Sequence, residues 1–100
     1  MDTKRQTSAE WFQKIAADAT KKIDEYKPDV VIVFDDNACE LVARKYTGQE
    51  LPFVFAGVNA DPAVYGFPAK NVTGAIERYN VASAIELLKK LAPNVKKAAV

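Results

Sequence analysis

Two short apolar runs, each followed directly by polar residues, decide the fold expected for this chain. Residues 30–37 read Val-Val-Ile-Val-Phe-Asp-Asp-Asn, and residues 52–59 read Pro-Phe-Val-Phe-Ala-Gly-Val-Asn. Continuous apolar runs of this length are typical of strands covered on both faces, as in a parallel sheet. Such sheets bind ligands outside the carboxyl ends of their strands. The polar residues that follow each run therefore stand where a ligand is expected.

A first helix is predicted over residues 8–26. Thr7 and Glu10 have the spacing of a capping box, and apolar residues recur at helical spacing after them. Pro28 ends the run because proline cannot continue a helix. The first apolar run then predicts a strand over residues 29–35.

A second helix is predicted to begin at Asn37, with Glu40 three residues later. Its inner face is expected to hold Ala38, Leu41, Val42 and Tyr46. The second strand follows over residues 52–58. Residues 59–71, which contain two prolines and a glycine, are expected to form a long loop of the kind that is more often functional than idle.

The last third of the chain predicts a short strand over residues 72–76, a helix that begins after Asn80 and is stopped by Pro93 and Asn94, and a strand over residues 95–100. Asn80 is expected to cap that helix, whose apolar face would point inward. This order of elements favours an α/β fold with a three-layer parallel sheet and right-handed crossovers. A sheet with so few strong strands has edges that would pair with another chain, so a homo-oligomer formed through exposed sheet edges is expected.

Composition excludes several classes of function. The 100 residues carry a net charge of +1, which gives no excess of positive charge for binding nucleic acid. The chain has no histidine, and Cys39 is its one cysteine, so a single chain holds no internal disulfide, no Cys/His zinc site and no Ser-His or Cys-His pair. Dinucleotide and phosphate-loop motifs are absent as well. We therefore expect no enzyme activity, no metal and no cofactor.

Successive blocks of the sequence resemble the substrate-binding proteins of ABC transporters that have the type I periplasmic-binding-protein fold. The blocks run in order along nearly the whole chain: residues 1–5, 27–38, 51–59, 65–68, 71–74 and 87–97. The resemblance implies a small solute and an ABC permease as partners, and a periplasmic or extracytoplasmic location. It also implies that the chain is a piece, with residues 1–79 forming part of a first lobe and residues 80–100 forming the crossover helix and first strand of a second.

The candidate ligand-binding residues follow the predicted strands. Asp35, Asp36 and Asn37 come after the first strand, and Gly57 and Asn59 end the second. Carboxylates accept hydrogen bonds from ammonium or hydroxyl groups, glycine permits close approach of the backbone, and asparagine both donates and accepts. Glu77, on the crossing toward the second lobe, is the sixth candidate. Because a helix N-terminus favours an anion and the aspartates favour a cation, an amino-acid-like zwitterion is the expected solute.

Three alternatives stay open. The same type of lobe serves as an extracytoplasmic sensor domain in signalling proteins. An isolated chain of this kind can also be a self-associating α/β fragment that binds no ligand. The acidic pair at 35 and 36 is finally compatible with a magnesium-dependent phosphoacceptor, although the second strand is followed by Asn59 where such a domain needs another aspartate.

Overall fold

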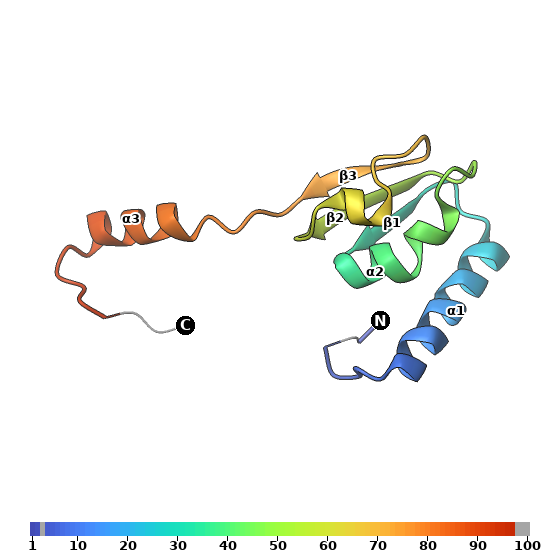
Figure 1. Ribbon diagram of the computed structural model, residues 1–100, viewed down its shortest axis with the longest axis horizontal. Helices are drawn as coiled ribbons and strands as arrows, with labels where there is room; N and C mark the ends of the chain where they lie inside the picture. The colour runs from blue at the N-terminus through green and yellow to red at the C-terminus, as the bar shows by residue number, and fades with distance from the viewer. Residues whose placement is uncertain (3, 98–100) are drawn as a thin grey trace.

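A computed structural model of the chain describes residues 1–2 and 4–97 and has a mixed α/β fold (Figure 1). Its helices are α1 (Ala9–Tyr26), α2 (Asp36–Leu41) and α3 (Val81–Leu91), and its strands are β1 (Val31–Phe34), β2 (Phe53–Val58) and β3 (Val72–Ile76). Two 3-10 helices, η1 (Ala43–Tyr46) and η2 (Pro62–Tyr65), lie before and after β2. The predicted α/β class is confirmed. Of the last predicted strand, residues 95–97 are irregular and residues 98–100 lie outside the described residues.

The three strands form one parallel sheet in the order β1-β2-β3. Val33 of β1 is in register with Phe55 of β2, and Phe53 of β2 is in register with Val72 of β3. Paired residues of neighbouring strands point to the same face, so these side chains share one side of the sheet. Because all strands run the same way, their carboxyl ends meet at one edge.

The core lies between this side of the sheet and the helices α1 and α2. Phe53 is 1% exposed, and its ring stacks on that of Tyr46 at 5.0 Å between centroids. Cys39 and Val42, on the inner side of α2 and just after it, are buried against the strands. Full burial of a side chain such as Phe53 stabilises the fold by roughly 1.5–3 kcal/mol. The predicted packing of Ala38, Leu41, Val42 and Tyr46 against the core is confirmed. The helix itself ends at Leu41, and Tyr46 lies in η1.

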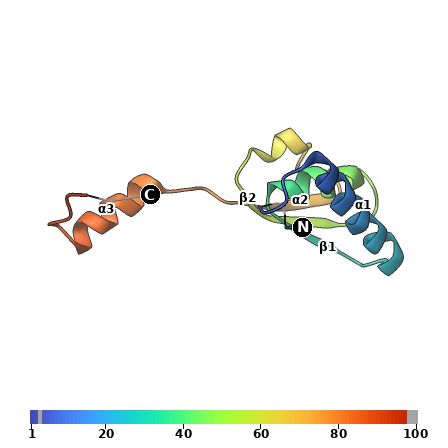
Figure 2. The ribbon, with the colours of Figure 1, turned by 90° about the horizontal axis from the view of Figure 1, so that it is seen from below.

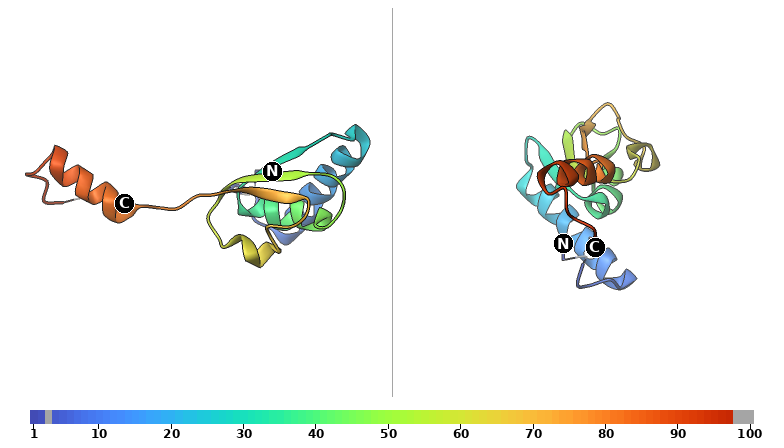
Figure 3. Two further views of the ribbon diagram at one scale, coloured as in Figure 1. Left: turned by 90° about the horizontal axis from the view of Figure 1, so that it is seen from above. Right: turned by 90° about the vertical axis from the view of Figure 1, so that its left-hand side faces the viewer.

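The opposite side of the sheet has no helix over it in the part of the chain that the structure describes. Helices α1 and α2 both lie on the core side, as Figure 2 shows from below, and Figure 3 shows the strands uncovered from above. Ile32, Phe34 and Val54 point away from the core and are 59%, 67% and 37% exposed. The described residues thus form two layers, and the predicted third layer is not present, because no described segment packs on this face.

Helix α3 stands away from the rest of the molecule (Figure 1). Residues 77–80 carry the chain beyond the carboxyl edge of the sheet without regular structure, and α3 has no buried residue. The extents of the molecule, 57 × 31 × 22 Å, reflect this position. The prediction that the apolar face of this helix points inward is therefore wrong for the described chain.

Two predicted helix caps move by one or two residues. Helix α1 is capped by Ser8, whose Oγ accepts a hydrogen bond from the Trp11 N–H at 3.2 Å, in place of Thr7. Helix α2 is capped by Asp35 in place of Asn37. Asn80 does occupy the N-cap position of α3, but its side chain makes no capping hydrogen bond. The first two corrections share a cause, since several neighbouring polar residues can cap a helix and the backbone selects one of them.

Candidate functional site at the carboxyl edge of the sheet

Parallel pairing brings residues from three strand ends to one edge of the sheet. Asp35 follows β1, Asn59 follows β2 and Glu77 follows β3. The Asp35 N–H donates to the Ala56 carbonyl at 3.1 Å, and the Glu77 N–H donates to the Val58 carbonyl at 2.7 Å. The backbone at both positions is thereby fixed to β2. The edge predicted from the sequence is present, with these residues along it.

Asp35 has a backbone conformation that is unusual for any residue other than glycine. Its φ is 76° and its ψ is 156°, and its Oδ1 accepts a hydrogen bond from the Asp36 N–H at 2.7 Å. A non-glycine residue in this region costs of order 1–3 kcal/mol, and such strain concentrates at functional sites. Gly57, with φ 64°, lies alongside, because a Cβ placed on it would be 4.0 Å from the Asp35 nitrogen.

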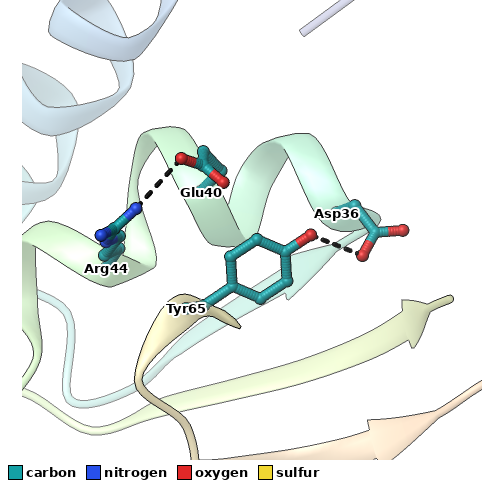
Figure 4. A network of polar contacts seen from close by, with 4 residues as sticks. All are labelled: Asp36, Glu40, Arg44 and Tyr65. Carbon is teal, nitrogen blue, oxygen red and sulfur yellow. Dashed lines mark hydrogen bonds and ion pairs between the residues drawn. The ribbon is translucent and has the colours of Figure 1, made fainter. Parts of the chain in front are cut away.

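Asp36 is occupied by contacts within the protein. Its Oδ1 accepts hydrogen bonds from the Tyr65 hydroxyl at 2.8 Å and from the Ala60 N–H at 3.2 Å, while Oδ2 accepts from the Asn59 N–H at 3.1 Å. Figure 4 shows the contact between Asp36 and Tyr65, with the Glu40–Arg44 pair further along the chain. The carboxylate therefore fastens the start of the loop after β2 and the end of η2 to the first turn of α2.

The charge state of this contact follows from its surroundings. Burial alone would raise the pKa of Asp36, but the hydrogen bonds from Tyr65, Asn59 and Ala60 outweigh it, so its pKa lies below the ordinary value of 3.8. Burial and the hydrogen bond to Asp36 raise the pKa of Tyr65 to about 12. The contact is thus a carboxylate that accepts from a neutral phenol across the neutral pH range.

The remaining candidates divide between two environments. Asp35 and Asn37 line a groove of about 600 Å³ that runs along the free edge of β1 beside α1, and the lining is otherwise largely apolar. Gly57, Asn59 and Glu77 are not among its lining residues. Within the described residues, the buried Oδ1 of Asn59 has no hydrogen-bond partner. The side chain of Glu77 is exposed.

The aromatic residues of the loop after β2 belong to the core. Tyr65 and Phe67 are buried, and the Phe67 ring stacks on that of Phe55 at 5.5 Å between centroids. These two side chains therefore hold the loop against the core and do not line a ligand site. Gly66 and Pro68 indicate a loop at this point because they break any regular element.

Asn71 has a role that sequence reasoning missed. Its Nδ2 donates to the carbonyls of Tyr46 and Leu51, both at 2.8 Å, and its Oδ1 accepts from the Gly48 N–H at 2.8 Å. One side chain thus satisfies three backbone groups of the connection between η1 and β2. The sequence holds no signal for this role beyond Asn-Val-Thr at 71–73, a three-residue pattern that also matches a glycosylation acceptor.

The described residues contain no group of three or more His, Cys, Asp or Glu side chains placed to hold a metal ion. None of the helices in the described chain combines the length and the apolar character needed to span a membrane.

Comparisons with protein-family models, with curated proteins and with solved structures find no match to this chain.

Proposed function

We propose that this chain is part of the solute-binding component of an ABC-type uptake system, and that its sheet edge forms one side of a cleft between two lobes. Residues 1–79 belong to the first lobe in this proposal, and residues 80–100 lead into the second. The observation that carries it is the strained conformation of Asp35 at the carboxyl end of β1, where ligands of parallel α/β sheets bind. The partners are then a small solute and a permease, in an extracytoplasmic compartment.

The chemistry of this edge suits a cationic or hydroxyl-bearing part of a solute. Asp35 offers a carboxylate beside the groove, and charge-assisted hydrogen bonds to a carboxylate are about twice as strong as neutral ones. The first N–H of α2 already donates to Asp35, and the helix has only 6 residues, so this edge has little to offer an anionic group. A solute such as an amino acid would present its ammonium group here and its carboxylate to the other lobe.

Asp36 and Tyr65 take a supporting part in this proposal. Their hydrogen bond, with those from the Asn59 and Ala60 N–H groups, fixes the loop that carries Asn59. A solute that spans from Asp35 to Asn59 would then meet Asn59 in a fixed position, which lowers the entropic cost of binding.

The test is a titration of the chain with single amino acids while backbone amide chemical shifts are followed by NMR. We expect shifts concentrated at positions 35, 37, 57 and 59 with at least one solute, and a reduction of about tenfold or more in affinity for Asp35→Asn, which keeps an oxygen for the helix cap. Asp29→Asn is the matched control, because Asp29 is exposed at the opposite end of β1. Equal affinity of both variants, or no shifts with any amino acid, would contradict the proposal.

A further inference from the structure

Two apolar surfaces remain uncovered in the described chain. The first, here called the open sheet face, consists of the side chains of β1, β2 and β3 that point away from α1 and α2. In register across the strands, Ile32 lies beside Val54 and Val54 beside Thr73, while Phe34 lies beside Ala56. A contiguous apolar surface on a small protein marks an interaction site.

The second surface is the apolar face of α3. Val81, Ala84, Ile85, Leu88 and Leu91 recur at helical spacing, while Ser83, Glu86 and Lys90 lie on the other side. Leu91 is 76% exposed and Val81 is 62% exposed. Isolated helices shorter than about 12–15 residues are marginal in water, so an 11-residue helix needs an apolar partner to be stable. The two uncovered surfaces are complementary in character, since helices pack on sheets through such faces.

The connection before α3 favours a partner in another chain. Residues 77–80, Glu-Arg-Tyr-Asn, contain neither glycine nor proline, and they carry α3 away from its own sheet, as Figures 1 and 3 show. The chain reverses between β1 and α2 through a positive φ at Asp35, and none of residues 77–80 has a positive φ. Docking on a second copy keeps the extended course that residues 77–80 have in the structure (Figure 1). Short connections of this kind favour exchange of an element between copies.

We infer that two copies of this chain form a two-fold symmetric dimer in which each α3 lays its apolar face on the open sheet face of the other copy. Reciprocal exchange forms two helix–sheet contacts, and specific interfaces bury about 1,200 Å² or more in total, which a single contact of one short helix does not approach. Two-fold symmetry closes the assembly, so neither surface remains free to bind a third copy. This dimer uses a different surface from the solute site and does not rest on the proposed function.

Cross-linking between two differently labelled chains tests the exchange directly. One chain carries Val54→Cys on the open sheet face and the other carries Leu88→Cys on α3, and the mixture is treated with a short bis-maleimide. Cys39 is fully buried in both chains and should not react. We expect a product of two chains joined between positions 54 and 88, and much less of it when Ser83→Cys, on the polar side of α3, replaces Leu88→Cys. Equal yields with both partners would overturn the exchange.

The solution mass from light scattering supplies the second test. The unmodified chain is expected at twice the chain mass of 11.0 kDa, Leu88→Ser at the mass of a monomer, and Lys90→Ser, on the polar side of α3, at the mass of a dimer. A cooperative thermal transition checks that the sheet and helices α1 and α2 of Leu88→Ser remain folded, since α3 itself is expected to lose helical structure without its partner. A monomeric unmodified chain would overturn the inference, whether or not α3 docks on its own sheet. A dimer that survives Leu88→Ser would also overturn it and would indicate pairing through the sheet edge.

Discussion

Asp36 shows how one carboxylate can be committed to structure at a position that a sequence marks as a ligand contact. It follows a strained residue at the end of β1, yet its oxygens are directed to the loop after β2 and to Tyr65. Hydrogen bonds to charged groups contribute roughly 1.5–3 kcal/mol to stability. The position of Asn59 at the edge therefore depends on Asp36.

The stability of the fold should fall in acid because of this residue. The folded pKa of Asp36 lies below its ordinary value of 3.8, so its contribution is present above that value and is lost as the pH falls through the folded pKa. We expect Asp36→Asn to lower the free energy of unfolding at neutral pH by roughly 1.5–3 kcal/mol. The gap between the two proteins should narrow below about pH 4.

Urea unfolding of both proteins from neutral to acidic pH measures that gap. Asp61→Asn is the control, because Asp61 is exposed and accepts a single hydrogen bond, from the Ala63 N–H. A gap that stays constant as the pH falls would contradict the assigned role of Asp36.

The Tyr65 hydroxyl should lose its proton at a higher pH than an ordinary tyrosine. Burial and the hydrogen bond to Asp36 raise its pKa from 10.0 to about 12, so its contribution to stability is present below pH 10 and is lost as the pH rises toward 12. In a titration followed by the ultraviolet absorbance of phenolate, Tyr65→Phe should remove the step near pH 12. If Tyr65→Phe removed a titration step at lower pH instead, the Tyr65 hydroxyl would not be hydrogen-bonded to Asp36.

Among the elements, β3 depends on the absence of a side chain at one position. A Cβ added to Gly74 would meet the Phe55 carbonyl oxygen and would lie 2.5 Å from the Phe55 Cγ. By contrast, Gly48 has φ 82° and open space around it, so an added Cβ there meets only the cost of a left-handed backbone.

Gly74→Ala should therefore cost more stability than Gly48→Ala. Overpacking costs roughly 1–3 kcal/mol or more when backbone must move, and a left-handed conformation of alanine costs roughly 1–2 kcal/mol. Thermal unfolding of the two variants gives the comparison. If Gly48→Ala proved the more damaging, the close approach of β2 and β3 at Gly74 would be ruled out.

The sequence predicted the elements of the sheet better than what surrounds them. The apolar runs at 31–34 and 53–58 are strands, as short apolar runs between turn residues favour, although Ile32, Phe34 and Val54 lie on the uncovered side of the sheet. The sequence predicts Asn37 as the cap of α2 where the structure has Asp35, because a positive φ at an aspartate cannot be recognised in the sequence. The absence of a third layer in the described chain could not be predicted either. The sequence shows that α3 has an apolar face, but not which surface this face packs against.

For the candidate site, the sequence predicts which residues lie along the edge of the sheet. It does not predict which contacts each side chain makes there. Parallel strands place Asp35, Asn59 and Glu77 at one edge wherever their side chains point. The engagement of Asp36 with Tyr65 joins residues 29 positions apart, so it depends on tertiary packing alone.

The whole molecule is more extended than a compact domain of its length. Its radius of gyration is 17.9 Å, whereas a compact domain of 100 residues has about 13 Å. The difference comes from α3 and the connection over residues 77–80. This connection is open to proteolysis, because its residues are exposed and outside regular structure.

Chymotrypsin should cut first after Tyr79. Tyr79 is 78% exposed in the connection, while Tyr26 is equally accessible but ends a hydrogen-bonded helix. Limited digestion with mass spectrometry should yield residues 1–79 as the first stable product, and Tyr79→Ser should slow its appearance. First cleavage within β1 or β2 would mean that the sheet opens more readily than the connection is cut.

Because Cys39 is buried, the rate at which its thiol is modified can report how often α2 leaves the sheet. The thiol is fully buried, and burial together with the charges of Asp36 and Asp35 raises its pKa to about 11, so it is neither accessible nor ionised while α2 is docked. A thiol reagent can modify it only during moments when α2 leaves the sheet. The rate of modification, compared with that of a short unfolded peptide, would then report the free energy of that opening in water without any denaturant.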